Sequence, residues 1–389
     1  MTAQQQTSNR SAKVNSFRVM TVMHRAAELE ATGQKIIHME VGEPDFTTAE
    51  PIIEAAKRAL DKGYTRYTAA PGIIKLRHLI CEHYQQNYGV DLGCEQILIT
   101  PGASGGLMLL TNLLVESGAG ILISDPAYPC VRNFIHLAGG QPQLVPVGRS
   151  ENFQPTVELL TSYVSDSTRG VWLASPGNPT GTIVDREQLS AIARWASSHN
   201  CHLLVDEIYH GLHYVDDLPT ALEIDPSAFV VNSFSKYFGM TGWRLGWIVV
   251  PESCVEVANR LAQNLFISSS SIAQHAALAA FEPQTREILE SRRDAFRLRR
   301  NFLAQSLREL GFGLSDRIDG AFYLYASIER FSSDSEAFCH DLLERFGVAI
   351  TPGTDFGEQE GLKHVRFAFT TGMDELRSGV DRLAQALGR

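Results

Sequence analysis

The chain has 389 residues, of which 44% are hydrophobic and 20% charged, values typical of a globular protein large enough for two domains. The formal net charge of −10 argues against nucleic acid as a partner, because such binding needs a basic surface. No stretch approaches the roughly 18 apolar residues of a membrane span. Residues 1–15 are polar and lack the apolar core of a secretory signal. We therefore expect a cytoplasmic protein with a flexible leader over residues 1–15.

The spacing of cysteines and histidines bears on metal binding. The six cysteines lie far apart with no C-x-x-C pair, which predicts reduced, mostly buried thiols. His199, Cys201 and His202 are close in sequence, as are His210 and His213. Neither group has a second pair at ligand spacing, so packed or solvated side chains are the simpler interpretation and no metal site is predicted.

The central part of the chain alternates short aliphatic runs with helical patterns. The helical patterns include residues 104–116 and 186–198, and Asp185 is expected to cap the second of these helices. The runs that predict strands are residues 96–100, 119–124, 170–174, 202–206, 229–232 and 245–250. This alternation predicts an α/β fold for residues 47–281, a large domain with a mostly parallel central sheet covered by helices on both faces.

Both ends of the chain are expected to form a smaller α+β domain. In the segment 16–46, residues 18–31 predict a helix and residues 36–39 a short strand. The segment 282–389 begins with a long charged helix, residues 285–310. It continues with helices and with strands predicted at residues 320–326, 347–350 and 364–368.

Lys236 follows the apolar strand that ends near residue 232, with Ser233 and Ser235 before it and Arg244 eight positions after it. A buried lysine is costly unless its charge is removed or used, and one use is an imine with a carbonyl cofactor. The serines and the arginine are donors suited to a phosphate. The segment thus predicts pyridoxal 5'-phosphate, although alone it also fits a surface lysine at a strand end.

Further motifs follow other strands of the predicted sheet, where ligands of open parallel sheets bind. Residues 101–106 form a glycine-rich turn that opens a helix, which is either an anion site or a tight connection. Asp206 ends the strand 202–206. Its carboxylate is expensive to bury unless it meets a cation such as a protonated pyridine nitrogen, or unless it caps the next helix. Glu207 is expected to serve structure or face solvent.

Two further motifs are loops that follow predicted strands of the same sheet. Residues 175–181 contain two prolines and two glycines, a composition that fixes a rigid loop and orients the amide of Asn178 toward a ligand. Residues 125–128 present Tyr128, whose ring either stacks on a planar cofactor or fills the core.

With Lys236, Asp206, Asn178, Tyr209 and Arg244 in these motifs, the chain resembles the class I/II aminotransferases of the fold-type I pyridoxal-phosphate superfamily, which includes aspartate aminotransferase-like enzymes. The resemblance runs from about residue 16 to the C-terminus. The motifs that carry it are Gly42-Glu43-Pro44-Asp45-Phe46, Tyr67 in Arg66-Tyr67-Thr68, Asn178-Pro179-Thr180-Gly181, Asp206-Glu207-Ile208-Tyr209, Ser233 to Lys236, and His364-Val365-Arg366.

This resemblance implies roles for individual residues. Lys236 is similar to the Schiff-base lysine, and Asp206 to the partner that keeps the pyridine nitrogen protonated and makes the ring an electron sink. Tyr209 is the third residue assigned to catalysis, and with Asn178 it would donate to the ring's O3'. Tyr128 is similar to the residue stacked on the ring.

The resemblance also implies binding groups. The phosphate would be held by Ala103, Ser104 and Gly105 through backbone, by Ser233, Ser235 and Arg244, and by Tyr67 from a partner subunit of a homodimer with shared active sites. Gly105 departs from the pattern, since many relatives carry a polar side chain there. Arg366 is similar to the arginine that binds the substrate α-carboxylate, beside Gly42 and Asn178. Taken locally, Arg366 also fits a strand residue facing solvent.

The implied reaction is a ping-pong transamination between an L-amino acid and a 2-oxo acid, with Lys236 moving the substrate proton. A carbon–sulfur β-lyase or an aminocyclopropane-carboxylate synthase on the same fold stays open, because the motifs do not separate these reactions. A non-catalytic effector domain of a transcription regulator is a more remote alternative. It would need a fused DNA-binding module, for which the leader is too short. The motifs predict no amino donor.

Overall fold

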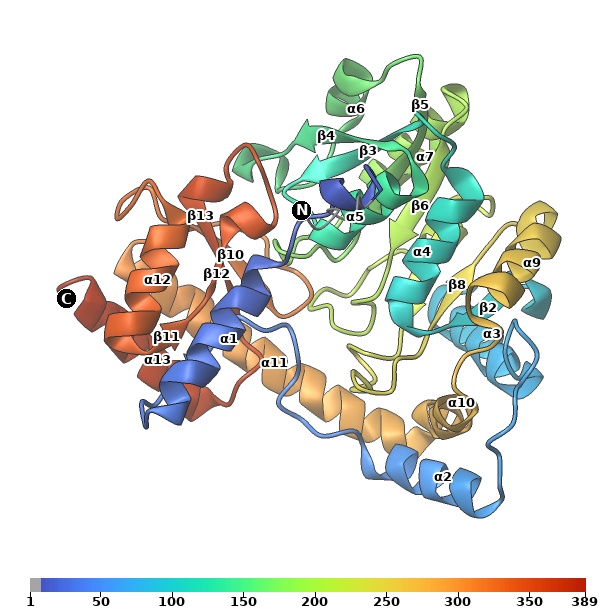
Figure 1. Ribbon diagram of the computed structural model, residues 1–389, viewed down its shortest axis with the longest axis horizontal. Helices are drawn as coiled ribbons and strands as arrows, with labels where there is room; N and C mark the ends of the chain where they lie inside the picture. Colours follow the sequence, from blue (N-terminus) through green and yellow to red (C-terminus); the bar gives the residue numbers. More distant parts are fainter. Residues whose placement is uncertain (1–7) are drawn as a thin grey trace, which may run out of the picture.

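The computed structural model describes residues 8–389 (Figure 1). Residues 1–7 of the expected leader lie outside the described residues. The rest of it, residues 8–15, forms a short 3₁₀ turn on the surface, Ser11–Lys13. There Arg10 Nη1 donates to the carbonyl oxygen of Leu137 at 3.2 Å, so this stretch contacts the helix that contains Leu137.

The central sheet has seven strands in the order β2-β8-β7-β6-β5-β3-β4. Only β8 runs antiparallel to its neighbours, β2 and β7. The prediction of a mostly parallel sheet is therefore confirmed. The strands are β2 (Ile97–Thr100), β3 (Gly120–Asp125), β4 (Gln141–Pro146), β5 (Thr168–Ala174), β6 (His202–Asp206), β7 (Phe229–Ser233) and β8 (Gly246–Val249).

Strand β4 was not predicted. It contains Pro142 and Pro146, which cannot donate a backbone hydrogen bond and which argue against a central strand. The structure places β4 at the edge of the sheet, paired only with β3. An edge strand tolerates proline because one of its sides makes no ladder hydrogen bonds.

Helices cover both faces of this sheet, because alternate side chains of its buried strands point to opposite sides. In β5, Val171 and Leu173 pack into one hydrophobic core and Trp172 into another. The first core is completed by α2 (Glu50–Asp61), α3 (Ile74–Tyr88), α6 (Val157–Tyr163), α7 (Arg186–Ser198), α8 (Ala221–Ile224) and α10 (Ser271–Ala277). The second is completed by α4 (Gly102–Leu114), α5 (Pro129–Ala138) and α9 (Val255–Phe266). As predicted, Asp185 caps α7, accepting from the backbone N–H of Gln188 at 3.0 Å.

A separate core lies around an antiparallel sheet of four strands, in the order β12-β13-β10-β9. Beside it β1 pairs with β11, which joins the N-terminal segment to the C-terminal part of the chain. The strands are β1 (Ile37–His38), β9 (Gly313–Leu314), β10 (Tyr323–Ser327), β11 (Val348–Ala349), β12 (Thr351–Pro352) and β13 (His364–Ala368). The helices are α1 (Arg18–Ala31), α11 (Pro283–Leu310), α12 (Ser335–Phe346) and α13 (Met373–Ala386).

Helix α11 connects the two parts of the molecule and runs diagonally across the lower half of the view in Figure 1, from beside α1 toward α10 and α2. Its 28 residues span about 42 Å at the usual helical rise. Leu289 near its start packs into the core of the large sheet, whereas Phe296 and Leu303 pack into the core around β10 and β13. One continuous helix therefore fixes the two sheets relative to each other.

The six cysteines are free. Cys201 and Cys339 are buried and the other four are only half-buried, so the expectation of mostly buried thiols is wrong. Between residues 8 and 389 no helix is both long enough and apolar enough to cross a membrane. In the same range no three side chains of His, Cys, Asp or Glu are grouped as metal ligands.

Candidate active site

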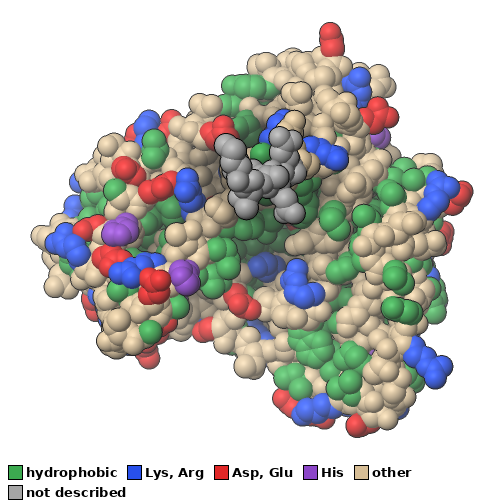
Figure 2. Space-filling model, in the orientation of Figure 1, with side chains coloured by type: hydrophobic (Ala, Val, Ile, Leu, Met, Phe, Trp, Pro, Cys, Tyr) green, Lys and Arg blue, Asp and Glu red, His purple; other side chains and the backbone are tan. Residues whose placement is uncertain are grey.

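The carboxyl ends of the parallel strands meet at a cavity of about 350 Å³. Register explains why, since Asp206 at the end of β6 pairs beside Ala174 of β5 and Val231 of β7. Residues of α1, β10 and β13 close the other side of the cavity. Figure 2 shows a hollow on this face of the molecule, between α1 and α4.

All but two of the predicted site residues line this cavity. They are Gly42, Ala103, Ser104, Tyr128, Asn178, Asp206, Tyr209, Ser233, Ser235, Lys236, Arg244 and Arg366. One of the two exceptions is Gly105. A Cβ added to it would lie 2.7 Å from Pro101 Cδ, so this position faces Pro101 and not the cavity. Tyr67 is 82% exposed and lies away from the cavity.

Lys236 projects into the cavity from the connection that follows β7. Its Nζ donates to the carbonyl oxygen of Gly42 at 2.7 Å. The same nitrogen lies 5.5 Å from the ring centroid of Phe322 and 5.9 Å from that of Tyr209. Among residues 8–389 the amine thus has a neutral backbone partner and aromatic neighbours, so it is not used in a structural ion pair.

Asp206 is a buried carboxyl group, 4% exposed. Burial raises the pKa of Asp206 to about 7, although the backbone N–H of Ile208 and the charge of Lys236 act in the opposite direction. Its Oδ1 accepts from Ile208 N at 3.1 Å. The next helix, α8, begins only at Ala221, so the interpretation of Asp206 as a helix cap is wrong. A buried carboxylate of this kind is suited to a cationic partner.

An anion cradle forms where α4 begins next to Arg244. Helix α4 has no side-chain cap, so its first backbone N–H groups are available to a ligand. Gly102 has φ of 69°, and a Cβ there would lie 2.5 Å from Arg244 Nη2. Only glycine therefore lets the guanidinium approach. Arg244 itself has φ of 53°, a strained conformation that clusters at functional sites. With the hydroxyls of Ser233 and Ser235 on the same cavity, these donors suit a phosphate.

Arg366, on β13, is buried, 4% exposed, so its interpretation as a solvent-facing residue is wrong. Its Nη1 donates to Asn178 Oδ1 at 3.0 Å, and its Nη2 donates to the carbonyl oxygen of Glu40. The guanidinium lies 4.3 Å from the ring centroid of Tyr323 and 4.7 Å from that of Phe356. Among the described residues its Nε has no partner. This fixed, incompletely paired cation fits a carboxylate.

Several residues of the cavity were not predicted from the sequence. Tyr323 is buried, and its hydroxyl lies 3.0 Å from that of Tyr209. Burial, together with Tyr323, raises the pKa of Tyr209 well above its ordinary value. A Cβ added to Gly42 would lie 1.7 Å from the Tyr323 oxygen, so glycine there makes room for this hydroxyl. In the sequence, Tyr323 has no feature that separates it from an ordinary core tyrosine.

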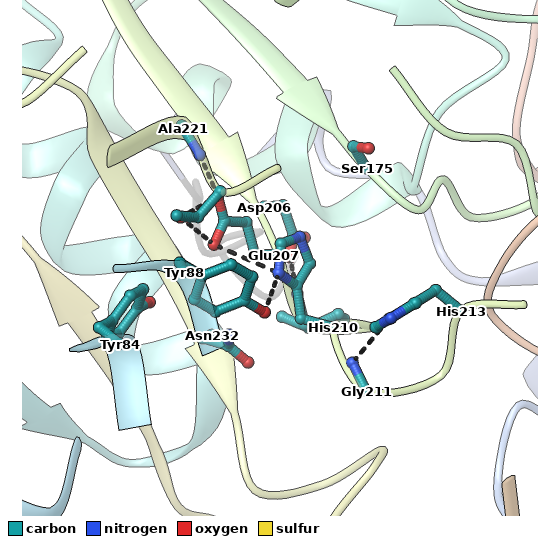
Figure 3. A network of polar contacts seen from close by, with 12 residues as sticks. Tyr84, Tyr88, Ser175, Asp206, Glu207, His210, Gly211, His213, Ala221 and Asn232 are labelled. Carbon is teal, nitrogen blue, oxygen red and sulfur yellow. Dashed lines mark hydrogen bonds and ion pairs between the residues drawn. The ribbon is translucent and has the colours of Figure 1, made fainter. Parts of the chain in front are cut away.

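Behind Asp206, a polar network surrounds Glu207 (Figure 3). Glu207 accepts from the hydroxyl of Thr220 at 2.9 Å and from Ala221 N at 2.7 Å. His210 Nδ1 lies 2.8 Å from the Tyr88 hydroxyl and 3.7 Å from Glu207 Oε2. Burial raises the pKa of Glu207 to about 8 and lowers that of His210 to about 3. Burial therefore disfavours the charged form of both groups, and Glu207 faces the interior and not solvent.

Comparisons with known proteins agree with this geometry. The model of the family aminotransferase class I and II matches residues 34–387. The chain is 37% identical to valine–pyruvate aminotransferase of Mycobacterium tuberculosis, over 97% of each chain. It is 35% identical to (5-formylfuran-3-yl)methyl phosphate transaminase of Methanocaldococcus jannaschii, over 98% of this chain and all of the relative.

Solved structures extend the similarity to the fold. An aminotransferase from Mycobacterium tuberculosis superposes with a TM-score of 0.96 at 36% identity, covering 99% of this chain and 100% of that structure. Aspartate aminotransferase from Thermus thermophilus with maleate gives 0.93 at 31% identity, covering 98% and 100%. Neither the lyase or synthase nor the non-catalytic alternative is favoured by these relatives. The chain belongs to the class I and II aminotransferases and is a transaminase.

Proposed function

We propose that this transaminase binds pyridoxal 5'-phosphate in the cavity and exchanges an amino group between an L-amino acid and a 2-oxo acid in a ping-pong reaction. The observation that carries the proposal is the meeting of three different groups at one cavity. These are the amine of Lys236, the buried carboxyl of Asp206 and the anion cradle beside Arg244. An amine, an acid and a phosphate site match the aldehyde, the pyridine nitrogen and the phosphate of that coenzyme.

The residues present fit the coenzyme. Lys236 would hold it covalently through the ε-amino group, and Asp206 would pair with its ring nitrogen. The phosphate would be held by the start of α4 and by Arg244, together with the hydroxyls of Ser233 and Ser235. When bound, the coenzyme supplies an electron sink that stabilises negative charge at the substrate Cα.

The side chains of the cavity have separate roles in the reaction. The Nζ of Lys236, once free, takes the proton from the Cα of the amino acid as general base in the first half-reaction. In the second half-reaction it delivers a proton as general acid to the Cα that derives from the 2-oxo acid. Asp206 supplies a negative charge in a buried place, where it keeps a ring nitrogen protonated. Arg366 binds the substrate α-carboxylate, and its hydrogen bond to Asn178 fixes the orientation of the guanidinium. Tyr209 and Asn178 donate toward the ring oxygen.

A second copy of the chain would complete the phosphate site with Tyr67. This tyrosine is 82% exposed, and Leu60, Tyr64 and Ile74 in the same segment are also exposed. Exposed apolar groups of this kind mark interaction surfaces. We expect sedimentation to give the mass of a homodimer, and Tyr67→Phe to raise the dissociation constant of the coenzyme. A monomer with full coenzyme affinity would contradict this part of the proposal.

The coenzyme assignment is tested by reduction with borohydride followed by peptide mass analysis. The purified chain supplied with pyridoxal 5'-phosphate should carry the reduced coenzyme on Lys236. Lys236→Ala should bind the coenzyme only noncovalently and lose turnover, whereas Lys363→Ala, at an exposed lysine on the surface, should behave as the unmodified chain. The proposal is wrong if the label is found on another lysine or if Lys236→Ala turns over at the normal rate.

A further inference from the structure

The first turns of α1 form one side of the active-site cavity. Val19, Met20 and Met23 line it from this helix, and Phe17 lines it from the preceding position. Residues 19, 20 and 23 share one helical face, since positions three and four apart are neighbours on a helix. Phe356, which directly follows the 3₁₀ turn Gly353–Asp355, also lines the cavity. Figure 2 shows hydrophobic side chains inside the hollow. A substrate that enters here therefore meets an apolar surface.

Asp355 fixes α1 in this place. Helix α1 has Phe17 at its N-cap position and no capping side chain of its own. The carboxylate of Asp355, which is distant in sequence, accepts from the backbone N–H of Arg18 at 2.7 Å and of Val19 at 3.4 Å. A carboxylate at a helix start is stabilising because it satisfies otherwise unpaired N–H groups. The same residue lines the cavity, so an acid lies beside the apolar side chains of α1.

The cations that line the cavity, within residues 8–389, are Lys236, Arg244 and Arg366. In the proposed function each of them already has a partner: the coenzyme aldehyde, the coenzyme phosphate and the substrate α-carboxylate. The remaining charged residues of the lining, apart from Asp206, are the acids Glu43 and Asp355. No described cation is therefore left for a second carboxylate on the substrate.

We propose that the substrate side chain lies against Met20, Met23 and Phe356, and that the enzyme acts on amino acids with uncharged, apolar side chains in preference to aspartate and glutamate. This inference rests on the proposed function. Met20 is 56% exposed, so the desolvation falls on Met23 and Phe356. A distal carboxylate would lose its water against these two side chains without gaining a cation, and it would be repelled by Asp355. An aliphatic side chain would instead bury apolar surface.

The preference is measured with the coenzyme-loaded enzyme and a panel of L-valine, L-leucine, L-alanine, L-aspartate and L-glutamate. We expect kcat/KM for the best aliphatic donor to exceed that for aspartate by at least about 100-fold, near the upper end of the penalty for a buried polar group left unpaired. If none of the five donors reacts, the apolar assignment is overturned, and the borohydride label on Lys236 decides separately whether the proposed function stands. If aspartate or glutamate is the best donor, transamination stands and the apolar assignment is overturned.

Substitutions on α1 localise the effect. Met23→Lys places a cation on the cavity and should lower the valine-to-aspartate ratio about tenfold or more, the lower limit for a new charge-assisted hydrogen bond. Thr21→Lys, on the exposed part of the same helix and outside the cavity lining, is the matched control and should leave the ratio unchanged. Asp355→Asn keeps an oxygen for the N–H of Arg18 but removes the charge, so it should also lower the ratio. Equal ratios in Met23→Lys, Asp355→Asn and the control would overturn the assignment.

Discussion

Replacement of Arg366 by lysine tests the substrate clamp most directly. In the structure the guanidinium donates to Asn178 and to the Glu40 carbonyl while Nε has no partner within the described residues. Lysine keeps the charge but presents one nitrogen, so it cannot make these contacts and a two-point contact to a carboxylate together. The variant therefore separates the geometry of the clamp from its charge.

The expected loss for Arg366→Lys is one charge-assisted hydrogen bond to the substrate, about 1.5–3 kcal/mol. This corresponds to a decrease in kcat/KM of about 10- to 150-fold. KM should carry much of the change, because the α-carboxylate is bound in the ground state as well as in the transition state. Coenzyme affinity should stay within about threefold of the unmodified enzyme, since the cradle at Arg244 is a separate set of donors.

The assay is steady-state kinetics with the best amino donor, combined with titration of the coenzyme by absorbance. Arg345→Lys, at an exposed ion pair with Asp341 on α12, is the matched control and should leave all constants unchanged. The reasoning is refuted if kcat/KM of Arg366→Lys stays within twofold of the unmodified enzyme. It is also refuted if the variant folds but loses coenzyme and substrate to the same extent.

Substitutions at Asp206, at Glu207 and at the Gly42–Tyr323 contact give distinct outcomes. Burial raises the pKa of Asp206 to about 7, so the folded coenzyme-free protein binds more protons than the unfolded chain below that pH, and stability falls as the pH rises toward 7. In denaturant titrations Asp206→Asn should therefore stabilise the coenzyme-free protein at pH 8 more than at pH 5. In denaturant titrations at pH 7, the free energy of unfolding should fall by less than about 1 kcal/mol in Glu207→Gln. It should fall by about 2–3 kcal/mol in Glu207→Ala, which leaves buried donors unpaired. Gly42→Ala should abolish turnover by collision with the hydroxyl and the ring of Tyr323, and Tyr323→Ala in the same chain, which removes both, should restore part of it. An additive loss in that double variant would contradict the collision.

Local sequence signals predicted much of the fold. The ranges 18–31, 186–198, 202–206 and 364–368 match α1, α7, β6 and β13, because each combines clear periodicity with a cap, turn or apolar run. The signal failed at β4, where the prolines are tolerated only because the strand lies at an edge. Edge position is a property of the whole sheet and is not encoded in the six residues themselves.

The residues that line the cavity could likewise be predicted only in part from local sequence signals. The residues at the ends of β5, β6 and β7 could be predicted because parallel strands bring their carboxyl ends together. Tyr323 and Asp355 could not, because they reach the cavity only through the way the second sheet packs against the first. Tyr67 was predicted from the family resemblance alone, and its role stays a prediction that depends on a second subunit.

The connection between β7 and β8 carries both Lys236 and Arg244. Helix α1, which also lines the cavity, comes from the N-terminal part of the chain and is not part of that connection. Because the antiparallel pairing of Ser233 with Gly246 fixes both ends of that connection, its length sets the separation between amine and cradle. Insertions or deletions there would misalign coenzyme attachment, while exchange of α1 would leave it intact. Engineers who wish to retarget this enzyme to a new amine should therefore randomise residues 17–23 and keep residues 233–246 constant.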